Sequence, residues 1–231
     1  MNFRESLNAN MNETLRLAVI HDELLKSRPN AHRKLEVLNK SGIVLMIACW
    51  EAFIEDLAMH SFDFLMSNAA DHTVFPSRVL TQASKPFWDS KDERGIWALA
   101  DDGWKTVLQS HRNKILQEHL GNFNTPRAPQ IDKLFEHLVG LSNLSSHWSW
   151  KGMKSEQAKK KLSELITFRG DIAHRLSTTR RVRRADVERS GIFIVRLAVA
   201  SGNTLRNFIH GRTGIYPWEE GDVEFVTSDS I

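Results

Sequence analysis

Residues 168–175 read FRGDIAHR and place an arginine, an aspartate and a histidine within one short segment. An imidazole exchanges protons near neutral pH, and a guanidinium binds carboxylates and phosphates in a fixed geometry. Arg169, Asp171 and His174 therefore form the strongest candidate for chemistry in the chain. The chemistry that these residue types indicate is proton transfer next to an anionic group.

Arg169 lies on the apolar side of a predicted helix. At about 100° per residue, it falls in line with the apolar residues Leu162, Leu165, Ile166, Ile172 and Ala173. Removing a guanidinium from water costs several kcal/mol unless a partner compensates for the lost solvation. One interpretation is a structural salt bridge to a carboxylate such as Glu51, Glu55 or Asp56. The other is a functional arginine whose partner is a ligand.

His174 follows Arg169 by five residues and is rotated from it by about 140° on an ideal helix. One chain therefore does not easily bring both side chains to one point. A histidine near the C-terminal end of a helix also interacts favourably with the helix dipole. A structural role thus stays open for His174 as well.

The residue patterns of other common catalytic and metal sites are absent from the sequence. The ten histidines do not fall at the spacings of structural zinc sites, and His111 and His119 have no third ligand in view. There is no phosphate-binding glycine loop, no Gly-x-Ser-x-Gly segment and no cysteine–histidine signature. The single cysteine, Cys49, lies in an apolar run and is expected to be a buried hydrophobic residue. The sequence predicts no metal and no cofactor.

The elements that position the segment are helices. Apolar residues recur at helical spacing over about 3–25, 31–65, 93–120, 129–141, 155–176 and 185–210. Residues 68–90 and 142–152 are predicted loops, the first with one short helix, and Asp101-Asp102-Gly103 weakens the third region. Residues 223–226 are the only strand-like segment and are too short to build a sheet. The fold class is all-α.

Charge is unevenly distributed along the chain. Six arginines and two carboxylates lie between Arg175 and Arg189, a local net charge of +4, whereas residues 213–231 hold five carboxylates and no basic residue. Such a basic segment is either a solvated helix start or a nucleic-acid contact. We predict a helical domain over 1–211 and an acidic tail over 212–231. A further hypothesis is that the tail covers the basic segment.

Composition describes an ordinary globular protein, with 41% hydrophobic and 26% charged residues. No apolar stretch approaches the ~20 residues of a membrane span. The first residues lack the apolar region of a secretion signal. We therefore expect a cytoplasmic protein that does not contact the membrane.

Two segments resemble the HEPN superfamily. Its hallmark is Arg-x4–6-His at the end of a core helix, and Arg169 and His174 fit the four-residue spacing. Residues 47–57, which read IACWEAFIEDL, are similar to a segment in the second helix of the RiboL-PSP type of HEPN protein. In that segment Trp50, Glu51, Glu55 and Asp56 form a structural motif.

The resemblance implies a helical bundle that dimerises and a metal-independent ribonuclease site built from both copies. His174 would then be the acid or base, and Arg169 would hold the scissile phosphate. The position after the arginine is commonly asparagine in the family and is Gly170 here, so Asp171 is a candidate to orient one of the other two. The basic segment would contact RNA through Arg175, Arg180, Arg181, Arg183 and Arg184.

The main hypothesis is an endoribonuclease that cleaves RNA by 2′-hydroxyl attack, as a toxin or phage-defence effector. Its partners would be RNA, a second copy, and an antitoxin or regulatory protein. The alternative is an inactive HEPN-like module that binds RNA or protein, and a third hypothesis is a purely structural bundle. Trp148 and Trp150 could stack on bases or pack against the bundle.

Overall fold

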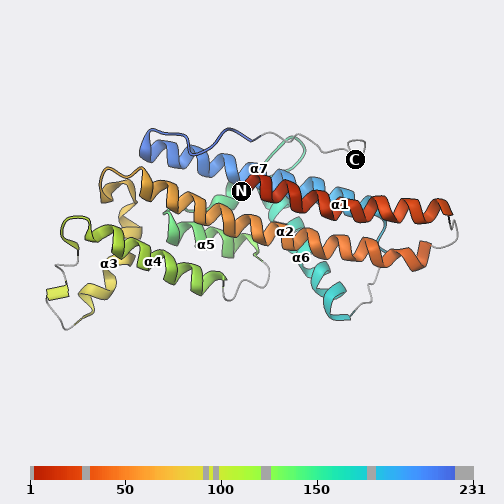
Figure 1. The fold of residues 1–231 in the computed structure, drawn as a ribbon, viewed down its shortest axis with the longest axis horizontal. Coiled ribbons are helices and arrows are strands. Elements are labelled where there is room, and N and C mark those ends of the chain that lie inside the picture. The colour runs from red at the N-terminus through yellow and green to blue at the C-terminus, as the bar shows by residue number, and fades with distance from the viewer. Residues whose placement is uncertain are drawn as a thin grey trace. The chain divides into compact units, whose positions relative to one another are not determined.

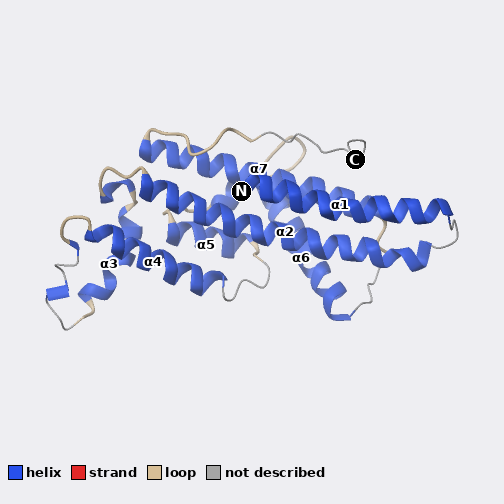
Figure 2. Cartoon of the chain, in the orientation of Figure 1, coloured by secondary structure: helices blue, strands red, loops and turns tan. Residues whose placement is uncertain are grey.

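A computed structural model describes residues 3–27, 32–90, 94–95, 99–120, 126–175 and 181–221 of the chain. Within these ranges the protein is built from helices, and no strand forms (Figure 2). Trp150 and Met153 form an isolated antiparallel bridge in the loop before α6. The predicted all-α class is confirmed.

The helices follow one another along the chain as Figure 1 labels them. The α-helices are α1 (Phe3–Ser27), α2 (His32–Ser67), α3 (Ser77–Trp88), α4 (Gly103–Leu120), α5 (Ala128–Leu138), α6 (Ser155–Arg175) and α7 (Arg184–Thr213). Two 3₁₀ helices, η1 (His72–Val74) and η3 (Leu144–His147), lie in loops.

Most predicted boundaries agree with the observed helices. The short helix expected within residues 68–90 is α3. Helix α4 begins later than predicted, at Gly103, because Asp101 adopts a φ of 50° that a helix does not continue through. Helix α6 begins at Ser155, as the predicted range does. The strand-like residues 223–226 lie outside the described residues.

The backbone forms two compact units. The first contains residues 1–54, 148–200 and 221–231, and the second contains residues 55–147 and 201–220. Helices α2 and α7 each contribute one part to each unit. The segment 168–175 and the basic residues 181–184 belong to the first unit.

The core of the first unit is centred on Trp50 of α2. Trp50 is fully buried, and its ring lies 5.9 Å from the Phe53 ring in a stacked arrangement and 5.9 Å, edge-on, from Trp148. Large aromatic side chains contribute more buried area than any other residue type. This cluster therefore holds the middle of α2 against the loop that precedes α6.

Helix α1 lies along the first part of α2 (Figure 1). Cys49 is 7% exposed, and its Sγ lies 3.7 Å from Thr14 Oγ1 on α1. Burial raises the pKa of the Cys49 thiol. The prediction that this cysteine is a buried hydrophobic residue is confirmed.

The core of the second unit joins α2, the turn around Phe75, α4 and α5. Phe62 and Phe75 pack with ring centroids 5.4 Å apart. Gly140 has a φ of +83°, and a Cβ there would lie 2.4 Å from Pro76 Cγ, so this turn requires glycine.

The chain folds back onto the end of α7 after Gly214. Arg206 Nε donates to the Trp218 carbonyl at 2.8 Å, and the Tyr216 ring stacks on His210 at 3.8 Å. The first part of the predicted acidic tail is therefore packed in the second unit. Residues 222–231 lie outside the described residues, so a tail that covers the basic segment stays a prediction.

None of the helices in the described ranges is both long enough and apolar enough to cross a lipid bilayer.

Candidate functional site

Helix α6 presents the candidate catalytic residues. Its buried face contains Ala158, Leu162, Ile166 and Ile172. Of the other residues of the predicted apolar stripe, Leu165 is partly buried and Ala173 is exposed. Arg169 starts from this face, and its side chain is partly buried. The helix therefore directs a guanidinium toward the interior side of α6.

The Arg169 guanidinium lacks a partner within the described part of the chain. Its Nε atom is buried and donates no hydrogen bond there, and no ion pair to a carboxylate forms among the described residues. A buried polar atom without a partner costs about 1–3 kcal/mol, and more when the group is charged. The structure thus lacks the salt bridge that would make Arg169 a purely structural residue.

His174 and Asp171 lie on other sides of the same helix and are exposed. The rotation of about 140° between positions five residues apart keeps the imidazole away from the buried face that carries Arg169. Among the described residues, no hydrogen bond or ion pair joins Arg169, Asp171 and His174. One chain presents these three groups without assembling them, and the orienting role of Asp171 stays a prediction.

Gly170 leaves open space beside Arg169. A Cβ built at this position would meet no heavy atom within 4 Å. The position therefore accepts a side chain, including the asparagine that is common in the family. Glycine here is not a packing requirement.

A groove lies between α2 and α6, and its α6 side includes Ala173, the residue before His174. It encloses about 660 Å³ and is lined by Glu36, Val37, Lys40, Ser41, Val44 and Leu45 of α2 and by Ile172 and Ala173 of α6. Val37 and Leu45, two apolar residues of its lining, are 58% and 45% exposed. We call this feature the α2–α6 groove.

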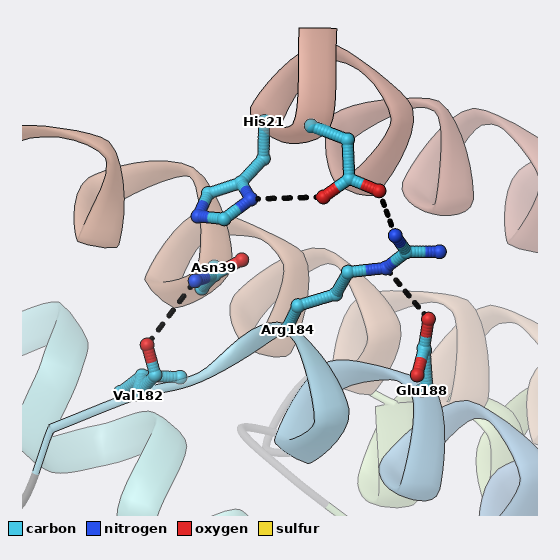
Figure 3. A network of polar contacts seen from close by, with 6 residues as sticks. His21, Asn39, Val182, Arg184 and Glu188 are labelled. Atoms are coloured by element: carbon cyan, nitrogen blue, oxygen red, sulfur yellow. Dashed lines mark hydrogen bonds and ion pairs between the residues drawn. The ribbon is translucent and has the colours of Figure 1, made fainter. Parts of the chain in front are cut away.

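Within the basic segment, Val182 is fixed to α2 by two hydrogen bonds. Val182 is 1% exposed, its N–H donates to Glu36 Oε1 at 3.1 Å, and its carbonyl accepts from Asn39 Nδ2 at 3.1 Å. Figure 3 shows the Asn39 contact beside the start of α7. Arg181 and Arg183, on either side of Val182, are exposed.

Arg184 differs from its neighbours because carboxylates of this chain pair with it, and its contact with RNA stays a prediction. It forms ion pairs with Asp22 on α1 and with Glu188 one turn further along α7, the latter at 2.7 Å (Figure 3). Its side chain is 34% exposed. Two carboxylates therefore neutralise Arg184, which joins α1 to α7. The side chain of Arg175 and all of Arg180 lie outside the described residues.

His21 lies in the same network. Its Nδ1 is 3.3 Å from Asp22 Oδ1, and its side chain is buried (Figure 3). Burial lowers the pKa of His21, and the positive charges of Arg184 and Arg181 lower it further. The basic segment thus exerts a positive potential on a buried imidazole.

The four residues of the expected structural motif, Trp50, Glu51, Glu55 and Asp56, all lie on α2. Trp50 is in the core, while Glu51, Glu55 and Asp56 are half-buried. Burial raises the pKa of Glu55, and the neighbouring charge of Asp56 raises it further.

Trp148 and Trp150 pack against the bundle, as one of the two alternatives predicts. Trp148 is fully buried, and Trp150 lies 6.1 Å from the Phe193 ring. Neither ring is presented to a base by the first unit.

His111 has a structural contact in the second unit. His111 Nε2 lies 3.0 Å from the His137 carbonyl oxygen within the second unit. No group of three or more histidine, cysteine, aspartate or glutamate side chains in the described ranges is arranged to hold a metal ion.

Sequence reasoning missed Glu36 and Asn39 as residues of this region. Asn39 precedes Ile43, Met46 and Trp50 on the buried face of α2 at helical spacing. A polar amide on an otherwise apolar stripe needs a hydrogen-bond partner, which was the available signal.

A comparison with protein families covers both segments that carry the resemblance, residues 47–57 and 168–175. Residues 10–205 match the family model described as RiboL-PSP-HEPN. The chain belongs to this family. The matched range includes Trp50, Arg169, His174 and the basic segment of this RiboL-PSP-HEPN protein. Searches of curated proteins and of solved structures returned no match.

Proposed function

We propose that this RiboL-PSP-HEPN protein is a metal-independent endoribonuclease whose site is completed by a second copy of the chain. In the proposed reaction the ribose 2′-oxygen loses its proton and attacks the adjacent phosphorus. The bond to the 5′-oxygen breaks, and that oxygen takes up a proton. The products are a 2′,3′-cyclic phosphate and a 5′-hydroxyl. His174 serves as the base or acid, and Arg169 holds the phosphate charge.

One observation carries this proposal. The Arg169 guanidinium has a buried Nε without a hydrogen-bond partner among the described residues, on the helix that also presents His174. A phosphate bound at the guanidinium would supply the negative charge that no described residue provides. The Arg-x4-His spacing within a RiboL-PSP-HEPN match points to the same role for the pair.

A second copy solves the geometric problem of the single chain. Arg169 and His174 diverge by about 140° on α6, so one helix does not direct both to one phosphate. The α2–α6 groove is lined on α6 by Ile172 and Ala173, which lie between the two motif residues in the sequence, and it exposes Val37 and Leu45. A two-fold interface that covers this groove would bury the apolar side chains and bring two copies of each motif residue together.

The first experiment incubates labelled single-stranded RNA with the pure protein in EDTA. We expect cleavage that leaves 2′,3′-cyclic phosphate ends, and we expect Arg169→Ala and His174→Ala to abolish it. His147→Ala removes another exposed histidine and is the matched control. Cleavage that persists in His174→Ala would disprove the assigned chemistry.

The second experiment tests the composite site. Leu45→Glu places a charge in the α2–α6 groove, and Ile20→Glu is its control on α1, with 45% and 43% exposure of the native residues. We expect only Leu45→Glu to produce monomers in light scattering and to stop cleavage. Mixing Arg169→Ala with His174→Ala should restore part of the activity, because a mixed dimer keeps one intact arginine and one intact histidine. A monomer with full activity contradicts the model.

A second candidate function is an inactive RNA- or protein-binding module. Gly170 supports it, because a polar residue is common at this position in the family. Gly170→Asn fits without a clash, since nothing lies within 4 Å of a Cβ there. Cleavage that appears only in Gly170→Asn, together with RNA binding by the native chain, would establish the module.

We also propose a toxin or phage-defence role in the cytoplasm, with an antitoxin or regulatory protein as partner. The family match supports this role only by analogy. Induced expression in bacteria should arrest growth for the native chain and not for His174→Ala. Equal growth of both strains would remove this role.

A further inference from the structure

Val182 is fixed more completely than an ordinary loop residue. Glu36 accepts from its N–H, Asn39 donates to its carbonyl, and its side chain is 1% exposed. Both peptide groups and the side chain are therefore held by the first unit. The backbone positions of the two neighbouring residues follow from this anchor.

Those neighbours are Arg181 and Arg183, which we call the arginine pair. Both are exposed, and neither forms an ion pair with a carboxylate in the part of the chain that the structure describes. The Arg183 N–H also donates to Asp186 Oδ2 at 2.9 Å, which fixes the backbone on that side. Two positive charges are thus held close together without a counter-charge.

The next arginine provides an internal comparison. Arg184 follows directly in sequence, yet Asp22 and Glu188 both neutralise it (Figure 3). If these arginines were only a solvated helix start, we would not expect one of them to be paired with carboxylates while its neighbours are left without an ion pair. The structure uses Arg184 as an anchor and leaves the arginine pair available to an anion.

Glu36 links the segment that carries the arginine pair to the α2–α6 groove. Glu36, which holds Val182, also lines this groove together with Ala173, the residue before His174. Lys40 lines it as well, 3.6 Å from Glu36. The same short stretch of α2 therefore contacts both the end of the motif helix and the basic segment.

We infer that Arg181 and Arg183 bind successive phosphates of the RNA strand beside His174, and that Asn39 is the positioning residue that presents them. The identity of the ligand as RNA rests on the proposed function, whereas the placement of the pair rests on the contacts of Val182. Guanidinium groups bind phosphate oxygens through paired hydrogen bonds. Contacts of this kind give affinity without reading base sequence.

Binding is measured in the His174→Ala background, so that the RNA stays intact. Arg181→Gln with Arg183→Gln should weaken the binding of labelled single-stranded RNA about tenfold and reduce its salt slope by about 1.4, since each single-strand phosphate contact contributes about 0.7. Arg16→Gln with Arg212→Gln removes two other exposed positive charges and should change neither quantity.

Asn39→Ala tests positioning through a double-mutant cycle. It should weaken RNA binding severalfold when the arginine pair is present and have no further effect when the pair is replaced. A merely structural role of Asn39 would lower affinity equally in both backgrounds. Circular dichroism checks that each variant is folded.

His21 supplies an independent readout. Because the charge of Arg181 contributes to its lowered pKa, an anion bound at the pair should raise that pKa. NMR titration with inorganic polyphosphate should show this rise in the native chain and not in the double variant. The His21→Gln spectrum assigns the signal.

The outcomes separate the two proposals. Cleavage by the native chain with unchanged RNA affinity in the double variant overturns this inference and leaves the proposed function standing. Lost affinity without any cleavage by the native chain supports the inference and removes the enzyme. A double variant that loses affinity for polyglutamate but keeps it for RNA assigns the pair to an acidic protein and also overturns the inference.

Discussion

Trp50 and Arg169, one residue from each segment that marks the family, differ in whether their own unit provides contacts for them. Trp50 is fully buried and touches Phe53 and Trp148 in its own unit. Arg169 has a buried Nε without a partner among the described residues, and His174 is exposed. Local rules are broken in proteins mainly where function requires it. Trp50 therefore stabilises the fold, and we expect Arg169 and His174 to meet their partners outside the chain.

The strongest test of this difference is His174→Ala. We expect RNA cleavage to fall by about 10²–10⁴-fold, the usual contribution of an acid–base group. The melting temperature should not change, because the side chain is exposed. Cleavage assays and calorimetry on one preparation measure both. A large loss of stability would place His174 with Trp50 as a structural residue.

Trp50→Ala should show the opposite pattern. Removing a buried tryptophan costs about 3–5 kcal/mol of unfolding free energy, because a cavity replaces the ring. Urea denaturation measures the loss, and Trp88→Ala is the control, since Trp88 is 69% exposed. A change below about 0.5 kcal/mol, as at surface positions, would contradict the core role of Trp50.

Gly170→Ala separates stability from chemistry at the site itself. Alanine in a helix interior is more favourable than glycine by about 0.8–1 kcal/mol, and a Cβ here meets nothing within 4 Å. Thermal denaturation should show a modest increase in stability. A decrease in stability would mean that position 170 requires glycine for a reason other than the space around it.

The smallest expected effect concerns pH. Burial and the nearby arginines lower the pKa of His21, so the folded state binds fewer protons than the unfolded state below about pH 6.5, the ordinary value for histidine. Stability should therefore fall as the pH decreases from 7.5 to 5.5. The decrease should be shallower in His21→Gln, measured by urea denaturation at each pH. Equal slopes would remove His21 from the pH response.

The helices and the apolar face of α6 could be predicted because periodicity is a local property of the sequence. Leu162, Ile166 and Ile172 are spaced by helical turns, and all three are buried as expected. The partly buried position of Arg169 follows from the same spacing. Whether a carboxylate would meet it could not be predicted, because that depends on contacts between distant segments.

The sequence also could not predict which arginines of the basic segment form ion pairs. Six arginines in a short run predict one common role, yet Arg184 is neutralised by Asp22 from α1. Asn39 and Val182 are separated by 143 residues in the chain. No local pattern indicates which arginine such a long-range contact will leave exposed.

The burial of Cys49 has a practical consequence for measuring distances in this protein. Its thiol is 7% exposed and its pKa is raised, so the reactive thiolate is scarce in the native state. Cys49 is the only cysteine of the chain. A cysteine introduced at an exposed position such as Ile20 can therefore carry a spin label or fluorophore without a background signal. Distances between labels on two copies would then report directly how those copies associate.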